Sequence, residues 1–297
     1  MPRMKKPFLQ DDAFLADVAA CRDDHSDALR LWWLGQSGFL MQCHGRHVLF
    51  DPYLSDSLTK KYAGTAKPHV RISERVIAPE RLDFIDIITS THGHTDHLDA
   101  ETLVPICRAV QARWISMGNS AETAIGPHLL YAAANDEMAW ERLQILDFLT
   151  SPMDAWEQRE VCKIEFTAVP AAHDTIQFDA DGYHLYLGYV CRYRSRTIYH
   201  SGDTVVYDGM VENLRGFSPI DVAILPINGK VGNMSGRDAA RLAKDIGARI
   251  VIPCHYDMFE FNTADPADEF IPECERLGQP YRVLQQGERF SSTELPA

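Results

Sequence analysis

The sequence predicts a layered α/β (α+β) fold, in which helices cover a partly parallel β-sheet. Apolar, β-branched runs such as residues 85–90 and 249–254 are typical of buried strands. Segments with helix-capping residues lie between these runs, and such alternation is typical of parallel sheets. The 297 residues are many for one domain, but a layered fold accommodates them. Since no linker or short repeat divides the chain, we expect one domain over 1–297, with its core at about 29–290.

The first half of the chain predicts an alternation of strands and helices. A Gly-containing turn at His44-Gly45 joins two expected strands, and Asp99 is the expected N-cap of a helix that runs to about Val110. The expected strands are 29–40, 47–51, 85–90 and 113–117, and the other expected helices are 11–21 and 121–130.

A long polar connection spans residues 55–82 and is punctuated by proline. Connections of this length inside a compact domain are usually functional or mobile. This one concentrates positive charge in an acidic protein, at Lys60, Lys61, Lys67, His69 and Arg71. We expect an active-site flap that brings positive charge to an anionic substrate. The alternative is an ordinary solvated loop.

The second half of the chain again predicts strands followed by helices. Ser235 and Asp238 form a capping-box-like helix start, and Gly247 ends that helix. A last helix is expected from Asp265-Pro266 to Gly278. The expected strands are 161–169, 183–190, 196–200, 221–227, 249–254 and 281–284.

The most informative segment is residues 91–97, Thr-His-Gly-His-Thr-Asp-His, which follows a buried strand and precedes a helix. His92 and His94 are two residues apart, so an extended backbone points both side chains to one side. The chain then bends, and Asp96 and His97 leave in another direction. One loop can therefore supply ligands to two neighbouring metal ions, and imidazole and carboxylate suit zinc, manganese or iron. The alternative is a solvated polar turn.

Three further expected strands end in, or lead into, a candidate ligand, namely His173, Asp203 and His255. Open α/β sheets place their sites at such strand ends. A single histidine after a strand would carry little weight, but four strand ends from both halves of the chain indicate one shared metal site.

The composition excludes several classes of partner. A net charge of −13 argues against nucleic acid or an anionic membrane as a partner. The seven cysteines are scattered, odd in number and without a Cys-x-x-Cys pair, which fits reduced thiols in the cytoplasm. No signal peptide or transmembrane run is recognised. We therefore expect a cytoplasmic protein with a small-molecule substrate, and a homo-oligomer is possible.

The histidine motif resembles the signature of the metallo-β-lactamase superfamily, His-x-His-x-Asp-His. Further stretches resemble the branch that contains L-ascorbate-6-phosphate lactonase, namely residues 32–35, 199–203, 226–229, 232–234 and 252–259, with Asn262 and Asp265-Pro266. The resemblance implies a four-layer αβ/βα sandwich with the metals at one edge.

The resemblance also implies a set of metal ligands. His92, His94 and His173 would surround one divalent ion, while Asp96, His97 and His255 would surround the other. Asp203 would bridge both ions. Zinc serves most of the superfamily and manganese serves the lactonase, and a ligand set without thiolate permits either.

The expected activity is metal-dependent hydrolysis, most simply of a lactone such as a phosphorylated sugar lactone. Two divalent ions would acidify a water so that hydroxide attacks the carbonyl carbon, and Asp96 would steer its proton. Asp51, Thr91 and Thr204 are candidates for orienting the ligands.

Five other residues are candidates for substrate contact. His200 is a candidate catalytic residue that touches substrate, or alternatively it holds the Asp203 loop. Asn228, Lys230, Asn233 and Tyr256 lie on loops expected to face the metals. Their alternative role is hydrogen bonding within the loops, which asparagine does readily.

Two other functions remain open at this point. One keeps the site but cleaves a phosphodiester, as the superfamily member that hydrolyses N-acylphosphatidylethanolamine does. A lipid substrate would favour an exposed apolar patch, and none is evident in the sequence. The other is a non-hydrolytic di-iron redox or sensing protein, which would normally need an electron-partner domain.

Overall fold

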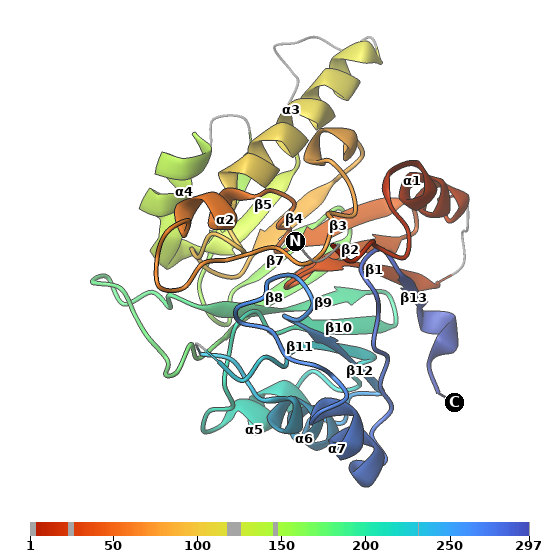
Figure 1. Cartoon of the computed structure of the whole chain (residues 1–297), viewed down its shortest axis with the longest axis vertical. Coiled ribbons are helices and arrows are strands. Elements are labelled where there is room, and N and C mark those ends of the chain that lie inside the picture. Colours follow the sequence, from red (N-terminus) through yellow and green to blue (C-terminus); the bar gives the residue numbers. More distant parts are fainter. Residues whose placement is uncertain (1–3, 23–26, 118–125, 145–147, 231, 297) are drawn as a thin grey trace.

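Two β-sheets pack face to face, and helices cover both outer faces, in the computed structural model of the chain (Figure 1). The structure describes residues 4–22, 27–117, 126–144, 148–230 and 232–296. The first sheet has the strand order β13-β1-β2-β3-β4-β5-β6, with bounds Arg289–Ser291, Leu29–Gly35, Gly38–Cys43, Arg46–Phe50, Ile87–Ser90, His128–Ala132 and Leu149–Met153. The second has the order β12-β11-β10-β9-β8-β7, with bounds Ile250–Cys254, Val222–Pro226, Arg196–His200, Leu187–Tyr193, Ile164–Pro170 and Gln158–Val161.

The helices form the two outer layers, which confirms the four-layer αβ/βα arrangement. Helices α1, α3 and α4 lie over the first sheet and α5, α6 and α7 over the second (Figure 1). In chain order α1 to α7 span Asp11–Ala20, Ser57–Lys61, Ala100–Ser116, Asp136–Leu143, Met210–Arg215, Gly236–Asp245 and Phe270–Leu277. Short 3₁₀ turns span Pro79–Arg81, Ala133–Asn135 and Ser292–Glu294. Among the described residues, no helix is both long and apolar enough to cross a bilayer.

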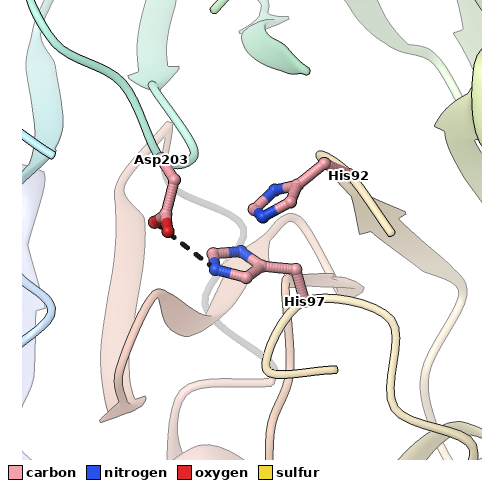
Figure 2. A group of neighbouring side chains, drawn as sticks. All are labelled: His92, His97 and Asp203. Carbon is pink, nitrogen blue, oxygen red and sulfur yellow. Dashed lines mark ion pairs between the residues drawn. The ribbon is translucent and has the colours of Figure 1, made fainter. Parts of the chain in front are cut away.

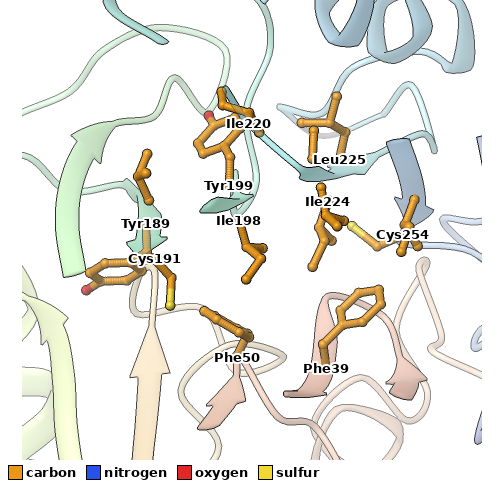
Figure 3. Packing of buried hydrophobic residues seen from close by; sticks show 14 of the residues in the cluster. Phe39, Phe50, Tyr189, Cys191, Ile198, Tyr199, Ile220, Ile224, Leu225 and Cys254 are labelled. Carbon is orange, nitrogen blue, oxygen red and sulfur yellow. The ribbon is translucent and has the colours of Figure 1, made fainter. Parts of the chain in front are cut away.

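The alternation of side chains along each strand explains why both faces of the first sheet are apolar. In β1, Leu31 and Trp33 belong to the core between the sheets. Trp32 and Leu34 belong to the core beneath α1 and α3. Successive strand residues point to opposite faces, so a continuous apolar run serves a sheet that is covered twice. Figure 3 shows the inner core, where Phe39 and Phe50 of the first sheet face residues of the second.

The strand directions bring four loops to one edge of the sandwich. β4 runs parallel to β3 and β5, and β10, β11 and β12 are mutually parallel. β8 is antiparallel to β9, which is antiparallel to β10, so β8 and β10 run in the same direction. The backbone N–H of Leu187 donates to the carbonyl of Thr91 at 3.0 Å, an ordinary hydrogen-bond distance. This bond ties the two sheets together at this edge.

Several helix and turn signals are confirmed. Asp99 is the N-cap of α3, and the Ser235 side chain accepts from the backbone N–H of Asp238 at the start of α6. Gly278 ends α7 in the left-handed conformation. His44 and Gly45 form the turn between β2 and β3.

The predicted strand at 113–117 is wrong, because α3 continues to Ser116. Trp114 and Ile115 are 42% and 44% exposed, so this apolar run does not enter a sheet. The sheet position is taken by β5 instead, which pairs in parallel with β4. Of the helix predicted at 121–130, residues 121–125 lie outside the described residues, and residues 128–130 belong to β5.

Other element boundaries also differ from the prediction. The run 29–40 is broken by a tight turn at Gln36-Ser37 into β1 and β2. Residues 281–284 form no strand; Tyr281 makes only an isolated bridge to Val251, and the closing strand is β13, beside β1. The last helix begins at Phe270, later than predicted. The sequence analysis did not identify β6, β7, α4 and α5.

Candidate metal centre

The loop 91–97 leaves β4 and is held from beneath by one buried carboxylate. Asp51, which is fully buried just after β3, accepts from the backbone N–H of Thr91 at 2.9 Å and from its hydroxyl at 2.6 Å. The other contact is with the ring of His97, whose Nδ1 lies 2.6 Å from Asp51 Oδ2. An imidazole that donates Nδ1–H to a carboxylate carries its lone pair on Nε2. The structure therefore turns His97 Nε2 toward the centre of the site.

All seven predicted ligands come together at this edge. Within each of three groups the ligand atoms all lie within 4.8 Å of one another; the groups are His92, His97 and Asp203; His94, His173 and Asp203; and Asp96, His97 and His255. Figure 2 shows the first group, in which His97 Nε2 lies 3.4 Å from Asp203 Oδ1.

Asp203 lies in the middle of this arrangement. Its Oδ1 is 3.4 Å from His255 Nε2 as well as from His97 Nε2. His92 Nε2 lies 2.9 Å from His94 Nδ1, which joins the first two groups. Asp203 belongs to two of the groups, as expected of a bridging ligand, and His97 also belongs to two. His92 lies with His97 and Asp203 and also contacts His94.

The donor atoms fit a divalent ion. Buried His97 Nε2 and Asp203 Oδ1 have no hydrogen-bond partner within the described protein. Buried polar atoms without a partner are costly, so they need an explanation such as an ion. Imidazole nitrogen and carboxylate oxygen are the donors that zinc, manganese and iron accept. We therefore assign His92, His94, Asp96, His97, His173, Asp203 and His255 as the candidate ligand set.

The charges within the cluster are strongly coupled. Burial favours the neutral acid at Asp203, but the imidazoles of His255 and His97 lower its pKa well below the ordinary value. Burial favours neutral imidazole at His255, but the carboxylates of Asp203 and Asp96 raise its pKa to about 9. Burial, with His97 and His94 nearby, lowers the pKa of His92 well below its ordinary value. A cation among these carboxylates would favour neutral imidazoles, so metal binding would be coupled to the release of protons.

A cavity of about 310 Å³ opens directly over the ligands. Five ligand residues line its floor, namely His94, Asp96, His173, Asp203 and His255. The segment 55–82 forms one wall with Leu58, Lys61, Tyr62, Lys67 and His69. The remaining wall is Gly93, Thr95, Met138, Arg142, Phe261 and Asn262.

The segment 55–82 is less irregular than the sequence suggests, since it contains α2 and a 3₁₀ turn. Its positive charges divide into two sets. Lys60 pairs with Glu101 at 2.7 Å and Arg71 pairs with Asp56 at 3.2 Å, and neither of the two lines the cavity. Lys61 and Lys67 line the cavity and form no ion pair among the described residues. Two of the positive charges of the segment therefore lie at the cavity, and its role as an active-site flap stays a prediction.

The structure does not support two predicted contacts. The hydroxyl of Tyr256 donates to the carbonyl of Leu284 at 2.5 Å, and its ring stacks on Trp33 at 4.2 Å between centroids. His200 is buried with Nε2 2.8 Å from the carbonyl of Ser37, and its ring stacks on Phe50. Neither residue lines the cavity. His200 is the last residue of β10 and Tyr256 stands two residues after β12, and both side chains are buried in the core instead of lining the cavity.

None of the remaining three predicted substrate contacts lines the cavity, and two of them support loops instead. Asn228 donates to the side-chain oxygen of Asn262 at 2.6 Å, and it is Asn262 that lines the cavity. Asn233 Oδ1 accepts from the backbone N–H of Thr204 at 3.1 Å, next to Asp203. Lys230 is exposed and lies outside the cavity lining. The alternative of hydrogen bonding within the loops therefore describes the two asparagines better.

Arg142 and Tyr186 belong to the site but were missed by the sequence analysis. Arg142 of α4 lines the cavity and donates to the carbonyl of Gly93 at 2.6 Å, which holds the motif loop. Tyr186 stacks on His173 with 4.8 Å between ring centroids and 13° between planes. No local signal marks Arg142, because α4 itself was not predicted. Tyr186 lies in a recognised strand pattern, but its partner is distant in sequence.

Comparisons with known proteins show the family of this chain. The sequence pattern of the family described as "Beta-lactamase superfamily domain" matches residues 46–256. A UPF0173 metal-dependent hydrolase of Methanopyrus kandleri is 29% identical over 269 residues, which cover 88% of this chain and 99% of that protein.

Two solved structures share the fold. A possible metal-dependent hydrolase from Veillonella parvula gives a TM-score of 0.65 at 16% identity, covering 88% of this chain and 98% of that one. The isothiocyanate hydrolase from Delia radicum gut bacteria gives a TM-score of 0.63 at 19% identity, and the match covers 88% of this chain and 98% of that one. These two likenesses show the fold, and the narrower lactonase branch stays a prediction.

Proposed function

Because this chain belongs to the beta-lactamase superfamily domain family and is a metal-dependent hydrolase, we propose that it opens the ring of a small anionic lactone, such as a phosphorylated sugar lactone. We further propose that it holds two divalent ions, zinc or manganese. The observation that carries the proposal is the convergence of five imidazoles and two carboxylates beneath one cavity.

We propose that the ligands divide between two ions. His92, His94 and His173 would hold one, Asp96, His97 and His255 the other, and Asp203 would serve both. When bound, such ions supply Lewis acidity, which acidifies water and polarises a carbonyl oxygen. The protein contributes a preorganised ligand set, since Asp51 fixes the tautomer and orientation of His97.

Asp96 is the proposed catalytic residue of the chain itself. It lines the cavity and its side chain is 16% exposed, so it can touch substrate or water. Burial favours its acid form, but the imidazoles of His97 and His255 lower its pKa strongly. An ionised Asp96 can orient the attacking water by accepting a hydrogen bond from it.

The anionic character of the proposed substrate rests on the cavity walls. Lys61, Lys67 and Arg142 line the cavity, and none of the three is paired with a carboxylate among the described residues. Ammonium and guanidinium groups at such a position favour phosphate or carboxylate on the ligand. Lys61 and Arg142 would then recognise substrate charge beside the motif loop, where they donate to Thr95 and to the carbonyl of Gly93.

A panel of lactones, with and without a terminal phosphate, tests the proposal. The purified protein should hydrolyse at least one lactone, lose that activity with a chelator and regain it with zinc or manganese. The phosphorylated member should show the lower KM, and Lys67→Gln should remove that advantage. No metal-dependent turnover of any lactone would rule out this substrate class. Faster cleavage of bis-p-nitrophenyl phosphate would favour the phosphodiesterase alternative.

A further inference from the structure

Gln36 lies in the tight turn between β1 and β2, far in sequence from every candidate ligand. It is 2% exposed and adopts a positive φ of 47°. This conformation is uncommon for a residue with a side chain, and it occurs where the surrounding structure imposes it. The turn therefore holds Gln36 in a defined position against the metal site.

The side-chain amide of Gln36 contacts two of the candidate ligands. Its Nε2 donates to Asp96 Oδ2 at 3.1 Å. The same nitrogen lies 3.5 Å and 3.4 Å from the two ring nitrogens of His255. The main chain adds a further contact, because the Gln36 carbonyl accepts from the backbone N–H of His255 at 3.0 Å. Gln36 thus joins the turn to both residues.

The orientation of the amide follows from charge. Asp96 Oδ2 also lies 3.7 Å from His97 Nε2 and 3.6 Å from His255 Nε2. If the Gln36 amide were reversed, its oxygen would face this carboxylate oxygen and repel it. With Nε2 toward Asp96, the buried Gln36 Oε1 has no hydrogen-bond partner in the described protein. A buried acceptor without a partner costs free energy. The hydrogen bond from Gln36 to Asp96 is therefore kept at a cost in stability.

We propose that Gln36 is a positioning residue for the ion held by Asp96, His97 and His255. Its N–H uses one lone pair of Asp96 Oδ2 in a charge-assisted hydrogen bond and leaves the other for the ion. It also fixes the carboxylate rotamer and packs beside the His255 ring. The inference rests on the proposed metal-binding role of these three residues and is independent of which substrate is hydrolysed.

The test compares metal affinity in two variants. Gln36→Leu removes the amide but keeps the main-chain contact and a similar volume. Gln42→Leu is the matched control, because Gln42 is 1% exposed, also has an unpartnered Oε1, and bonds to Val18 and His47 away from the site. Zinc is titrated into the chelated proteins by calorimetry. We expect Gln36→Leu to lower the affinity for one zinc ion by about 10–100-fold, as the loss of groups that orient metal ligands does. We expect Gln42→Leu to leave the affinities for both ions unchanged.

A double-mutant cycle shows whether Gln36 acts through Asp96. In an Asp96→Asn background, Gln36→Leu should change the affinity by no more than about twofold, the usual error of additivity. Cobalt loading provides a second readout, since the visible spectrum should change in Gln36→Leu and not in Gln42→Leu. Three outcomes would overturn the proposal. The first is a wild-type zinc affinity and cobalt spectrum in Gln36→Leu, and the second is an equal loss of zinc affinity in both leucine variants. The third is an undiminished effect of Gln36→Leu in the Asp96→Asn background. Failure of the wild-type protein to bind any divalent ion would overturn the proposed function with it.

Discussion

Asp51 shows how much of the site depends on one residue. Its two oxygens bind the backbone N–H and the hydroxyl of Thr91 and contact the ring of His97. Asp51 ends a strand in the sequence, and its role as an orienting group was expected. What the sequence does not reveal is that the same carboxylate fixes both the loop backbone and a ligand tautomer.

Gly232 allows the closest approach of a loop to a ligand. A Cβ at this position would lie 2.5 Å from Cγ of His173, whose ring is stacked on Tyr186 and has little room to move. We expect Gly232→Ala to displace His173 and to lower kcat/KM on a metal-dependent substrate by at least about tenfold.

The control for this prediction is Gly247→Ala. Gly247 has a φ of 71°, close to the 76° of Gly232, but nothing lies within 4 Å of its Cβ position. Both variants should lose about 1–2 kcal/mol in urea unfolding from the left-handed backbone alone. Only Gly232→Ala should lose activity; equal activities would show that the position of His173 is not critical.

Tyr256 provides a test of its corrected role. Because its hydroxyl donates to the Leu284 carbonyl in a buried position, Tyr256→Phe should destabilise the fold by about 1 kcal/mol. KM and kcat should stay at wild-type values, since the residue does not line the cavity. Urea unfolding and steady-state kinetics check both statements, and a large rise in KM would restore the original interpretation.

At the scale of elements, α6 and α7 are joined by a buried carboxylate on α7. Glu273 accepts from Arg241 of α6 at 2.7 Å and from Arg276 of its own helix at 2.8 Å. The guanidinium groups of Arg276 and Arg241 lower the pKa of Glu273 to about 2 from its ordinary 4.5. A carboxylate whose pKa is lower in the folded state than in the unfolded state stabilises the fold at pH values above its unfolded-state pKa. This contribution is lost as the pH falls toward the folded-state pKa.

We therefore expect Glu273→Gln to reduce the free energy of unfolding at pH 6, and the difference from wild type to shrink as pH falls from about 4.5 toward about 2. Urea unfolding at several pH values measures this. Glu275→Gln is the control, because Glu275 is exposed on the same helix, and its one side-chain hydrogen bond among the described residues is a long one from Tyr281 at 3.3 Å. A pH-independent difference at Glu273 would show that its charge is not the cause.

Elements with strong local signals were predicted well. Capped helices and strands with continuous β-branched runs, such as β4, β11 and β12, follow from the sequence because their residues have one stable arrangement in a covered sheet. The C-terminal turns of α3 misled the prediction because Trp114 and Ile115 are apolar and yet exposed. β6 and β7 are short and half polar at sheet edges, so periodicity could not identify them.

At the scale of the whole molecule, metal binding should stabilise the fold, because the ligands come from both sheets. A bound metal ion whose free concentration is 100 times its Kd adds about 2.7 kcal/mol to the free energy of unfolding. Chelation should therefore lower Tm by about 5 °C for a chain of this size, and zinc should restore it. Asp203→Asn should show a much smaller shift, since it removes the shared ligand. Differential scanning calorimetry measures Tm, and a wild-type Tm that does not change on chelation would contradict this coupling.

The sequence by itself determined the fold class and the seven candidate ligands, because ligand chemistry is carried by residue type and each ligand follows a recognisable strand. Only the tertiary structure decided what surrounds them. Gln36, Arg142 and Tyr186 contact the site across long sequence separations, while Tyr256 and His200 turn inward to fill the core. Local patterns fix where a strand ends; the packing of the two sheets fixes which side chains at those ends reach the cavity.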